Sequence, residues 1–311
     1  MKGHSMTRLG KPLASIQSVV ILSVLACSQP VFAADLGQSE AASPPAPAGS
    51  GWEKSLTSYG WLTFLSGSTT VKGRTVDVDV DPIQVIDHLD RMPFMGYGEI
   101  RKGPLALYTD IVYADLGLSE SGIHARPNGT IGTALGLNFT QLIAEAGLLY
   151  EVARWDETPG SIKDPAASSS YTALDLYAGA RYWYQELDVN FSLTGTADTG
   201  GLVVSGARAI ARSGSVDWAD PLIGLRLRHQ YAPGTELFVK GDIGGFGAGS
   251  QFSWNVLGAV NYEIMRTSSY NASAYLGYRA LSVDYVQGEG WNRYEFNVIQ
   301  HGPVIGVTVK Y

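Results

Sequence analysis

Eleven charged residues lie within otherwise apolar, alternating stretches of this sequence, and their types and spacing could do chemistry together. They are Glu99, Arg101, Asp110, Glu145, Asp175, Arg181, Arg226, Arg228, Lys240, Asp242 and Arg279. Each alternates with apolar neighbours, so it lies on the polar face of an extended strand. Charges enclosed by such strands form salt bridges or line a narrow passage for ions. The mixture of signs favours a salt-bridged interior over a wide pore.

Four histidines after the first 33 residues are the other candidates for acid–base or nucleophilic chemistry. His88 and His124 lie in predicted loops, His229 at the end of a predicted strand and His301 at a predicted bulge. None has a serine partner at a spacing typical of a histidine-assisted nucleophile. We therefore predict no catalytic residues.

Asp77, Asp79 and Asp81 have the spacing of the first ligands in a calcium-binding loop. Such a loop requires Gly at its sixth position and Glu at its twelfth, where this chain has Pro82 and His88. This excludes an EF-hand, and we predict no metal site. A weak surface cation site stays open beside the alternative of a strand edge that its charges keep from aggregating.

Closely spaced glycines at 241–249 are the remaining pattern that could bind a cofactor. A glycine-rich phosphate cradle precedes a helix, whereas this run lies between two predicted strands. We interpret the run as the end of a hairpin and predict no cofactor.

The stretches that carry the charged residues alternate with a period of two, which predicts β-strands. Residues 93–101 and 105–116, joined by the turn 102–104, form a hairpin. A change of hydrophobic phase near Thr140 predicts a bulge. We expect loops at 119–128, 158–170 and 194–216, and an acidic extended segment with a short helix within 67–92. The strands are predicted at 57–66, 93–101, 105–116, 131–154, 174–185, 220–231, 237–243, 251–263, 271–285 and from 294 onward.

The last ten residues, GPVIGVTVKY, form a strand with Pro303, Ile305, Val307, Val309 and Tyr311 on one face. They resemble the C-terminal signal of Gram-negative outer-membrane β-barrels, a glycine followed by alternating apolar positions and a final aromatic residue. The resemblance implies that the barrel-assembly machinery reads Gly306, Val307, Val309 and Tyr311. It also implies outer-membrane lipid and lipopolysaccharide as surroundings.

The composition of the 311 residues agrees with strands in a membrane. Only 16% of the residues are charged, against roughly 25% in soluble domains. No apolar run after the first 33 residues approaches the roughly 20 residues of a membrane helix. The net charge of −7 argues against a nucleic-acid partner, whose phosphates bind Lys and Arg.

The first 33 residues have the pattern of a signal peptide. Lys2, Arg8 and Lys11 precede an apolar stretch at 13–27, and Val31-Phe32-Ala33 forms a cleavage site. Attachment of a lipid to Cys27, the only cysteine, is the less favoured alternative, since a bulky Leu25 precedes it where a small residue is usual. Residues 34–56 are rich in Ala, Pro and Ser and predict a flexible segment.

The sequence therefore predicts an all-β fold over residues 57–311, a closed antiparallel up-and-down transmembrane β-barrel of about ten strands, with eight or twelve as alternatives. In hydrocarbon the first and last strands must pair, because an open edge would find no hydrogen-bonding partner. The apolar, aromatic-rich face would look outward to lipid. A soluble β-sandwich is the alternative fold.

We predict a porin-like or structural protein of the outer membrane, which passes small solutes or ions through a narrow charged lumen. A surface binding protein that uses long extracellular loops is the second hypothesis. An outer-membrane hydrolase or lipid-modifying enzyme is the third. The sequence predicts no oligomeric state.

Overall fold

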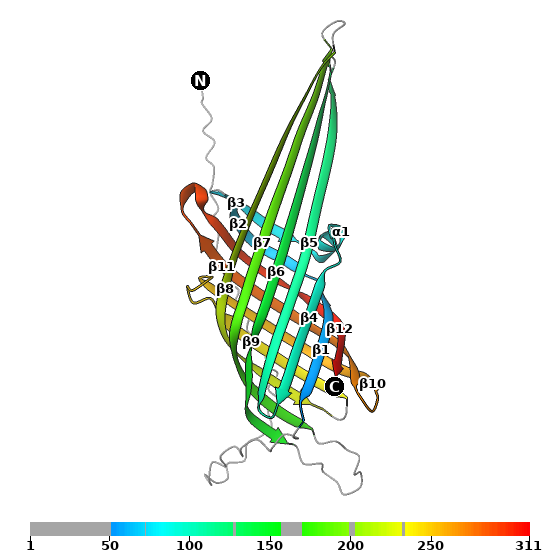
Figure 1. Ribbon diagram of the computed structural model, residues 1–311, viewed down its shortest axis with the longest axis vertical. Coiled ribbons are helices and arrows are strands. Elements are labelled where there is room, and N and C mark those ends of the chain that lie inside the picture. The colour runs from blue at the N-terminus through cyan, green and yellow to red at the C-terminus, as the bar shows by residue number, and fades with distance from the viewer. Residues whose placement is uncertain (1–50, 72, 127–128, 157–169, 199–202, 232–233) are drawn as a thin grey trace, which may run out of the picture. The chain divides into compact units, whose positions relative to one another are not determined.

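A closed ring of ten antiparallel strands forms the body of the protein in this computed structural model (Figure 1). The structure describes residues 51–71, 73–126, 129–156, 170–198, 203–231 and 234–311. In order around the ring the strands are β1 (Glu53–Trp61), β4 (Phe94–Lys102), β5 (Leu105–Arg126), β6 (Gly129–Asp156), β7 (Tyr171–Asp198), β8 (Val203–Gln230), β9 (Thr235–Gly244), β10 (Phe252–Arg266), β11 (Asn271–Gln287) and β12 (Tyr294–Lys310).

The ring closes because β1 pairs with β12, from Ser55 opposite Lys310 to Trp61 opposite Val304. Closure gives the backbone groups along this seam partners that an open sheet edge would lack. The predicted closed antiparallel barrel of about ten strands is confirmed. Its first strand starts at Glu53, four residues before the predicted start at Thr57.

Beside β12, two further strands and a short helix extend the wall. β2 (Phe64–Val71) pairs with the first half of β12, and β3 (Arg74–Val80) pairs with β2. The predicted strand 57–66 is thus two strands, separated at residues 62–63. The acidic segment is β3, and the expected short helix is α1 (Pro82–Asp87).

The helix α1 starts where Asp81 accepts hydrogen bonds from the backbone N–H groups of Ile83 and Gln84, a capping box. No helix among the described residues is long and apolar enough to cross a membrane. A short helix also follows β11, the 3-10 turn η1 (Gly290–Asn292).

Four strands, β5 to β8, are 22 to 28 residues long and rise beyond the others in Figure 1. The prediction of loops at 119–128 and 194–216 is therefore wrong for most of these residues. Ser119 pairs with Gly136, and Gly195 with Gly206, in continuous ladders. The Gly, Ser and Thr content suggested loops, but cross-strand partners decide whether such residues form strands.

The apolar face of the long strands changes sides part way along. In β6, Leu148 and Tyr150 are exposed on the outside, whereas Leu135 and Leu137 share the inward face of the buried Ile143 by alternation. In β11, Leu276 and Tyr278 are exposed on the outside, but Leu281, Val283 and Tyr285 are buried inside. Along the length of the strands, the outer surface is thus apolar towards one end of the barrel and polar towards the other.

This change of face corrects the predicted bulge near Thr140. The β5–β6 and β6–β7 ladders run through Thr140 without a register shift, and the shift in β6 lies between Glu151 and Ala153. The apolar side chains of an uninterrupted strand can move from one face to the other without a bulge, if the surroundings of the two faces change along its length. The expected bulge at Gly302 is also absent from the continuous β11–β12 ladder.

Gly302 allows β12 to pass the break between β1 and β2. Its φ is 156°, and a Cβ atom there would collide with the backbone carbonyl oxygen of Leu62. Any side chain would push this part of the wall away from β12.

We expect Gly302→Val to prevent most of the chain from closing into a ring. Gly60→Val on β1 is the matched control, because a Cβ atom at Gly60 meets nothing within 4 Å. Both variants are compared with the unsubstituted chain by the fraction that keeps a compact band in unheated detergent electrophoresis. Equal compact fractions for all three proteins would contradict this role of Gly302.

Candidate functional site

The structure places all eleven charged residues named above inside the ring, although they come from seven different strands. Ten are buried, and the Glu99 side chain is 11% exposed. Their neighbours along each strand face outward: Leu225 and Leu227, on either side of Arg226, are both exposed.

Arg181 and Arg279 are the centres of what we call the inner network. Arg181 Nη2 donates hydrogen bonds of 2.7 Å to Glu145 and to Asp242. Arg279 Nη1 donates to Asp110 at 2.9 Å. All these side chains are nearly fully buried. Buried charges require such partners, because removal of a charge from water is costly.

Neutral side chains complete the inner network. Asn255 links its two halves, because it donates to Asp242 at 2.9 Å and accepts from Arg279 Nε at 3.0 Å. The Tyr59 hydroxyl donates to Asp110 and the Tyr177 hydroxyl to Asp242. The predicted interior residues did not include these three, because only charged side chains were selected, although alternation puts Tyr177 on the same face of β7 as Asp175.

Three arginines, Arg101, Arg226 and Arg228, form a second group, which we call the arginine cluster. All three donate to Asp175, which is fully buried. Arg226 also donates to Glu99 at 2.6 Å, and Arg228 to Glu151 at 2.8 Å. Glu151 was not among the predicted interior residues.

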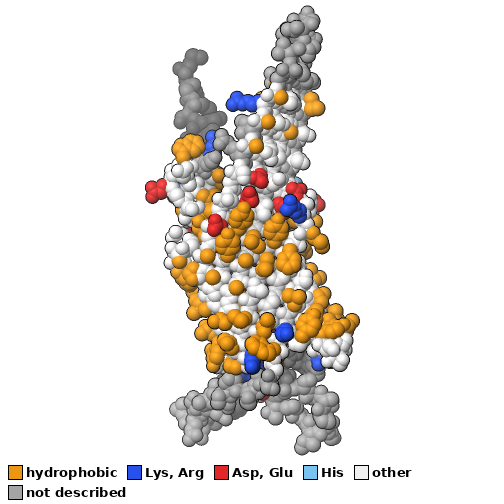
Figure 2. Space-filling view, in the orientation of Figure 1, with side chains coloured by type: hydrophobic (Ala, Val, Ile, Leu, Met, Phe, Trp, Pro, Cys, Tyr) orange, Lys and Arg blue, Asp and Glu red, His pale blue; other side chains and the backbone are white. Residues whose placement is uncertain are grey.

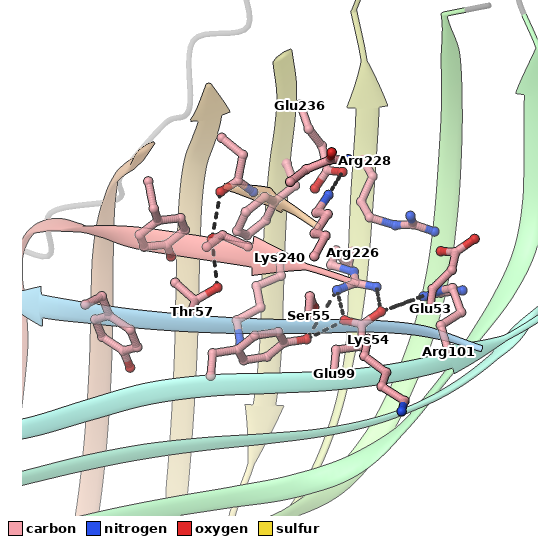
Figure 3. A pocket seen from close by; sticks show the side chains of 18 of the residues that line it. Glu53, Lys54, Ser55, Thr57, Glu99, Arg101, Arg226, Arg228, Glu236 and Lys240 are labelled. Carbon is pink, nitrogen blue, oxygen red and sulfur yellow. Dashed lines mark hydrogen bonds and ion pairs between the residues drawn. The ribbon is translucent and has the colours of Figure 1, made fainter. Parts of the chain in front are cut away.

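A cavity of about 340 Å³ lies beside the arginine cluster. It extends from Asp110 and Lys240 to the end of the ring that carries Lys54, Lys310 and Tyr311. Figure 3 shows the side chains of Glu99, Arg226 and Lys240 together in this space. We refer to it as the chamber.

Apolar side chains fill the interior beyond the inner network, in the part of the barrel whose outer surface is polar. The Trp183 ring stacks on Trp218 with centroids 5.4 Å apart, and Trp218 stacks on Tyr285 at 3.9 Å. Trp183 is 0% exposed, and Leu281 and Val298 join the same cluster. We call this the aromatic layer. Together with the inner network it fills the middle of the ring with packed side chains.

The residues considered for other chemistry lie apart from the chamber. His229 shares a hydrogen bond with Thr172, His301 with Tyr278, and His88 with the backbone of Gln84. The side chain of His124 lies outside the described residues. In the part of the chain that the structure describes, no three His, Cys, Asp or Glu side chains group in a way that could hold a metal ion.

The four residues of the terminal motif lie at the end of β12. Val307 and Tyr311 are exposed on the outer face, with Val309 between them on the same face. A Cβ atom at Gly306 would collide with the backbone carbonyl oxygen of Ser58, so β1 and β12 can pair only if this position is glycine. The requirement for Gly306 thus has a structural cause within the ring.

Arg181→Met would leave Glu145 and Asp242 without their guanidinium partner inside the ring. We expect this to lower the free energy of unfolding by about 3–5 kcal/mol, the usual cost of an unpaired buried charge. The control is Arg266→Met, which breaks the exposed pair of Arg266 with Glu263 and should leave stability nearly unchanged. Urea unfolding in detergent micelles, followed by tryptophan fluorescence, measures both. Equal stability of the two variants would contradict the account.

Comparisons with known proteins found no matching family model and no matching curated protein. Solved structures are similar only at a low level. A FadL homologue from Pseudomonas aeruginosa has 8% identity and a TM-score of 0.26, over 84% of this chain and 90% of that one. OpdK of Pseudomonas aeruginosa with vanillate has 8% identity and a TM-score of 0.24, over 84% and 98%.

The Ralstonia pickettii toluene transporter TbuX has 10% identity and a TM-score of 0.20, over 85% of this chain and 90% of that one. Likeness at this level carries no argument about what this chain does. The strand pairings define the fold.

Proposed function

We propose that this chain is an outer-membrane β-barrel, and that the part of the barrel with the apolar outer surface spans the bilayer. The observation that carries the proposal is the outward apolar surface of a ring whose ionised groups face inward. Leu276 and Ile305 are each 60% exposed, and Leu225 and Leu227, the outward neighbours of Arg226, are apolar and exposed too. Soluble proteins rarely expose such continuous apolar surface, whereas a bilayer core requires it.

The dimensions of this surface agree with a bilayer. β4 and β9 have 9 and 10 residues, which matches the roughly 9–11 residues of a tilted membrane-spanning strand. On the face shown in Figure 2, hydrophobic side chains cover the lower and middle part of the ring, and acidic side chains lie above most of them. Tyr262 and Tyr311 near one end, and Phe94 and Tyr278 near the other, are exposed, as in aromatic girdles.

The partners follow from this location. We propose outer-membrane lipid and lipopolysaccharide around the ring, and the barrel-assembly machinery as reader of Gly306, Val307, Val309 and Tyr311. Export would depend on residues 1–33, which lie outside the described residues together with 34–50.

Inside the ring, the packing supports a porin-like barrel that is closed in the state described. A small solute would enter the chamber from the end that carries Lys54 and Tyr311. Its further passage would require displacement of the inner network and of the aromatic layer, in which Trp183 and Trp218 stack. The chamber therefore acts as a binding compartment, and passage of ions is blocked.

The other two hypotheses have less support. Surface binding by long loops loses its basis where the predicted loops are paired strands of β5, β7 and β8. No contact of His88, His229 or His301 in the described part of the chain favours hydrolysis, so we propose no enzymatic activity.

In planar lipid bilayers, the unsubstituted protein should give no steady ion conductance. The double variant Trp183→Ala, Trp218→Ala removes two stacked indoles from the interior and should give small, steady openings. Trp155→Ala is the control, since Trp155 is exposed and its loss should open nothing. Steady openings of the same size in the unsubstituted protein would contradict the closed interior.

A further inference from the structure

Lys240 differs from the other charged side chains inside the ring. It is 5% exposed, yet no hydrogen bond or ion pair found among the described residues involves its Nζ atom. Its Nζ atom lies over the faces of two rings, at 5.3 Å from the centroid of Tyr97 and 5.8 Å from that of Tyr108. Such contacts stabilise a cation, but they leave the three N–H donors of the ammonium group without acceptors.

The charged groups around Lys240 are already engaged. Arg226 lies directly opposite it on β8 and bonds Glu99 and Asp175. On β6 and β9, Glu145 and Asp242 both accept from Arg181. On β10, the residue opposite is Leu257, which is apolar. Each of these carboxylates has a guanidinium partner, although Glu145 Oε1 accepts no hydrogen bond in the described part of the chain and the charge of Glu145 acts on Lys240. Among the described residues, no carboxylate oxygen lies within ion-pair distance of Lys240 Nζ.

Lys240 lines the chamber, so a ligand there can reach its donors. The lining includes six Lys and Arg side chains against four Asp and Glu side chains, because several balancing carboxylates, such as Asp175 and Asp242, lie behind it. The side chains that an entering anion would meet therefore include more cations than carboxylates. A buried ammonium group without an ion-pair partner is stabilised most by a hydrogen-bond acceptor that carries a negative charge.

The rest of the wall indicates what kind of anion fits. Tyr97, Phe238, Leu257 and Tyr275 give the chamber apolar and aromatic faces. Its volume of about 340 Å³ is at the small end of the range of ligand pockets, roughly 300–1,000 Å³. Lys240 offers one buried ammonium without an ion-pair partner among the described residues, which matches one carboxylate better than several.

We propose that the chamber binds a small organic monoanion, with its carboxylate on Lys240 Nζ and its apolar body against Tyr97 and Phe238. This deepens the proposed function, because it names the class of solute that the chamber would take. The carboxylate accepts hydrogen bonds from Lys240, and the aromatic faces exclude water from the body of the ligand.

Benzoate is a suitable probe, and benzamide is its uncharged analogue of nearly the same shape. Isothermal titration of the full chain, folded in detergent micelles, should show benzoate binding. Benzamide should bind at least tenfold more weakly. Lys240→Met should weaken benzoate binding at least tenfold, and Lys240→Arg should retain most of it, since a cation remains.

The matched control is Lys102→Met. Lys102 also lies over an aromatic ring, at 5.2 Å from the centroid of Trp52, but it does not line the chamber. Its loss should leave benzoate affinity unchanged. Unheated electrophoresis checks that each variant is folded, and if Lys240→Met does not fold, the ratio of benzoate to benzamide affinity in the unsubstituted protein decides.

Absence of benzoate binding, equal affinity for benzamide, or equal benzoate affinity in a folded Lys240→Met variant would each overturn the proposal. These outcomes are separable from failure of the proposed function. A lipid-embedded, non-conducting barrel without benzoate binding would overturn the anion site alone. Benzoate binding by a protein that conducts freely would leave the anion site and overturn the closed interior.

Discussion

The pairing of β1 with β12 is the interaction on which the rest of the structure depends. Seven residue pairs, from Ser55 opposite Lys310 to Trp61 opposite Val304, join the two ends of the ten-strand sheet. Closure separates an inner face from an outer one, so the same alternation can bury ions on one side and present apolar side chains on the other. Glycine at 302 and 306 allows the seam to form, because a side chain at either position would collide with the backbone of the segment opposite.

Enclosure strengthens the attraction between the charged side chains inside the ring. Arg181, Glu145 and Asp242 are almost completely shielded from solvent, so their attraction is stronger than at a surface. The network fixes the wall strands relative to one another, while the aromatic layer fills the space beyond. Among the buried charged side chains that the structure describes, Lys240 differs in having no hydrogen bond or ion pair, and it lines the chamber.

Much of the fold could be predicted from the sequence, because a period of two reports directly which residues share a face. Arg226 and Arg228 around Leu227 are an example. The partners could not be predicted, since Glu99 and Arg226 are 127 positions apart in the chain and only closure brings them together. The bulge expected at Thr140 was wrong because hydrophobic phase also depends on the surroundings of the strand. Loop composition misled at Gly195 for a similar reason, since its partner Gly206 supplies the ladder.

The orientation of the two faces relative to lipid can be measured directly on β12, where Ile305 and Asn297 share the outer face. Single cysteines at these positions, with Cys27 replaced by Ser, would carry spin labels in protein reconstituted into lipid vesicles. The account predicts that a label at 305 meets dissolved oxygen but not a water-soluble nickel chelate, and that a label at 297 meets the chelate. Equal access of the nickel chelate to both labels would contradict it.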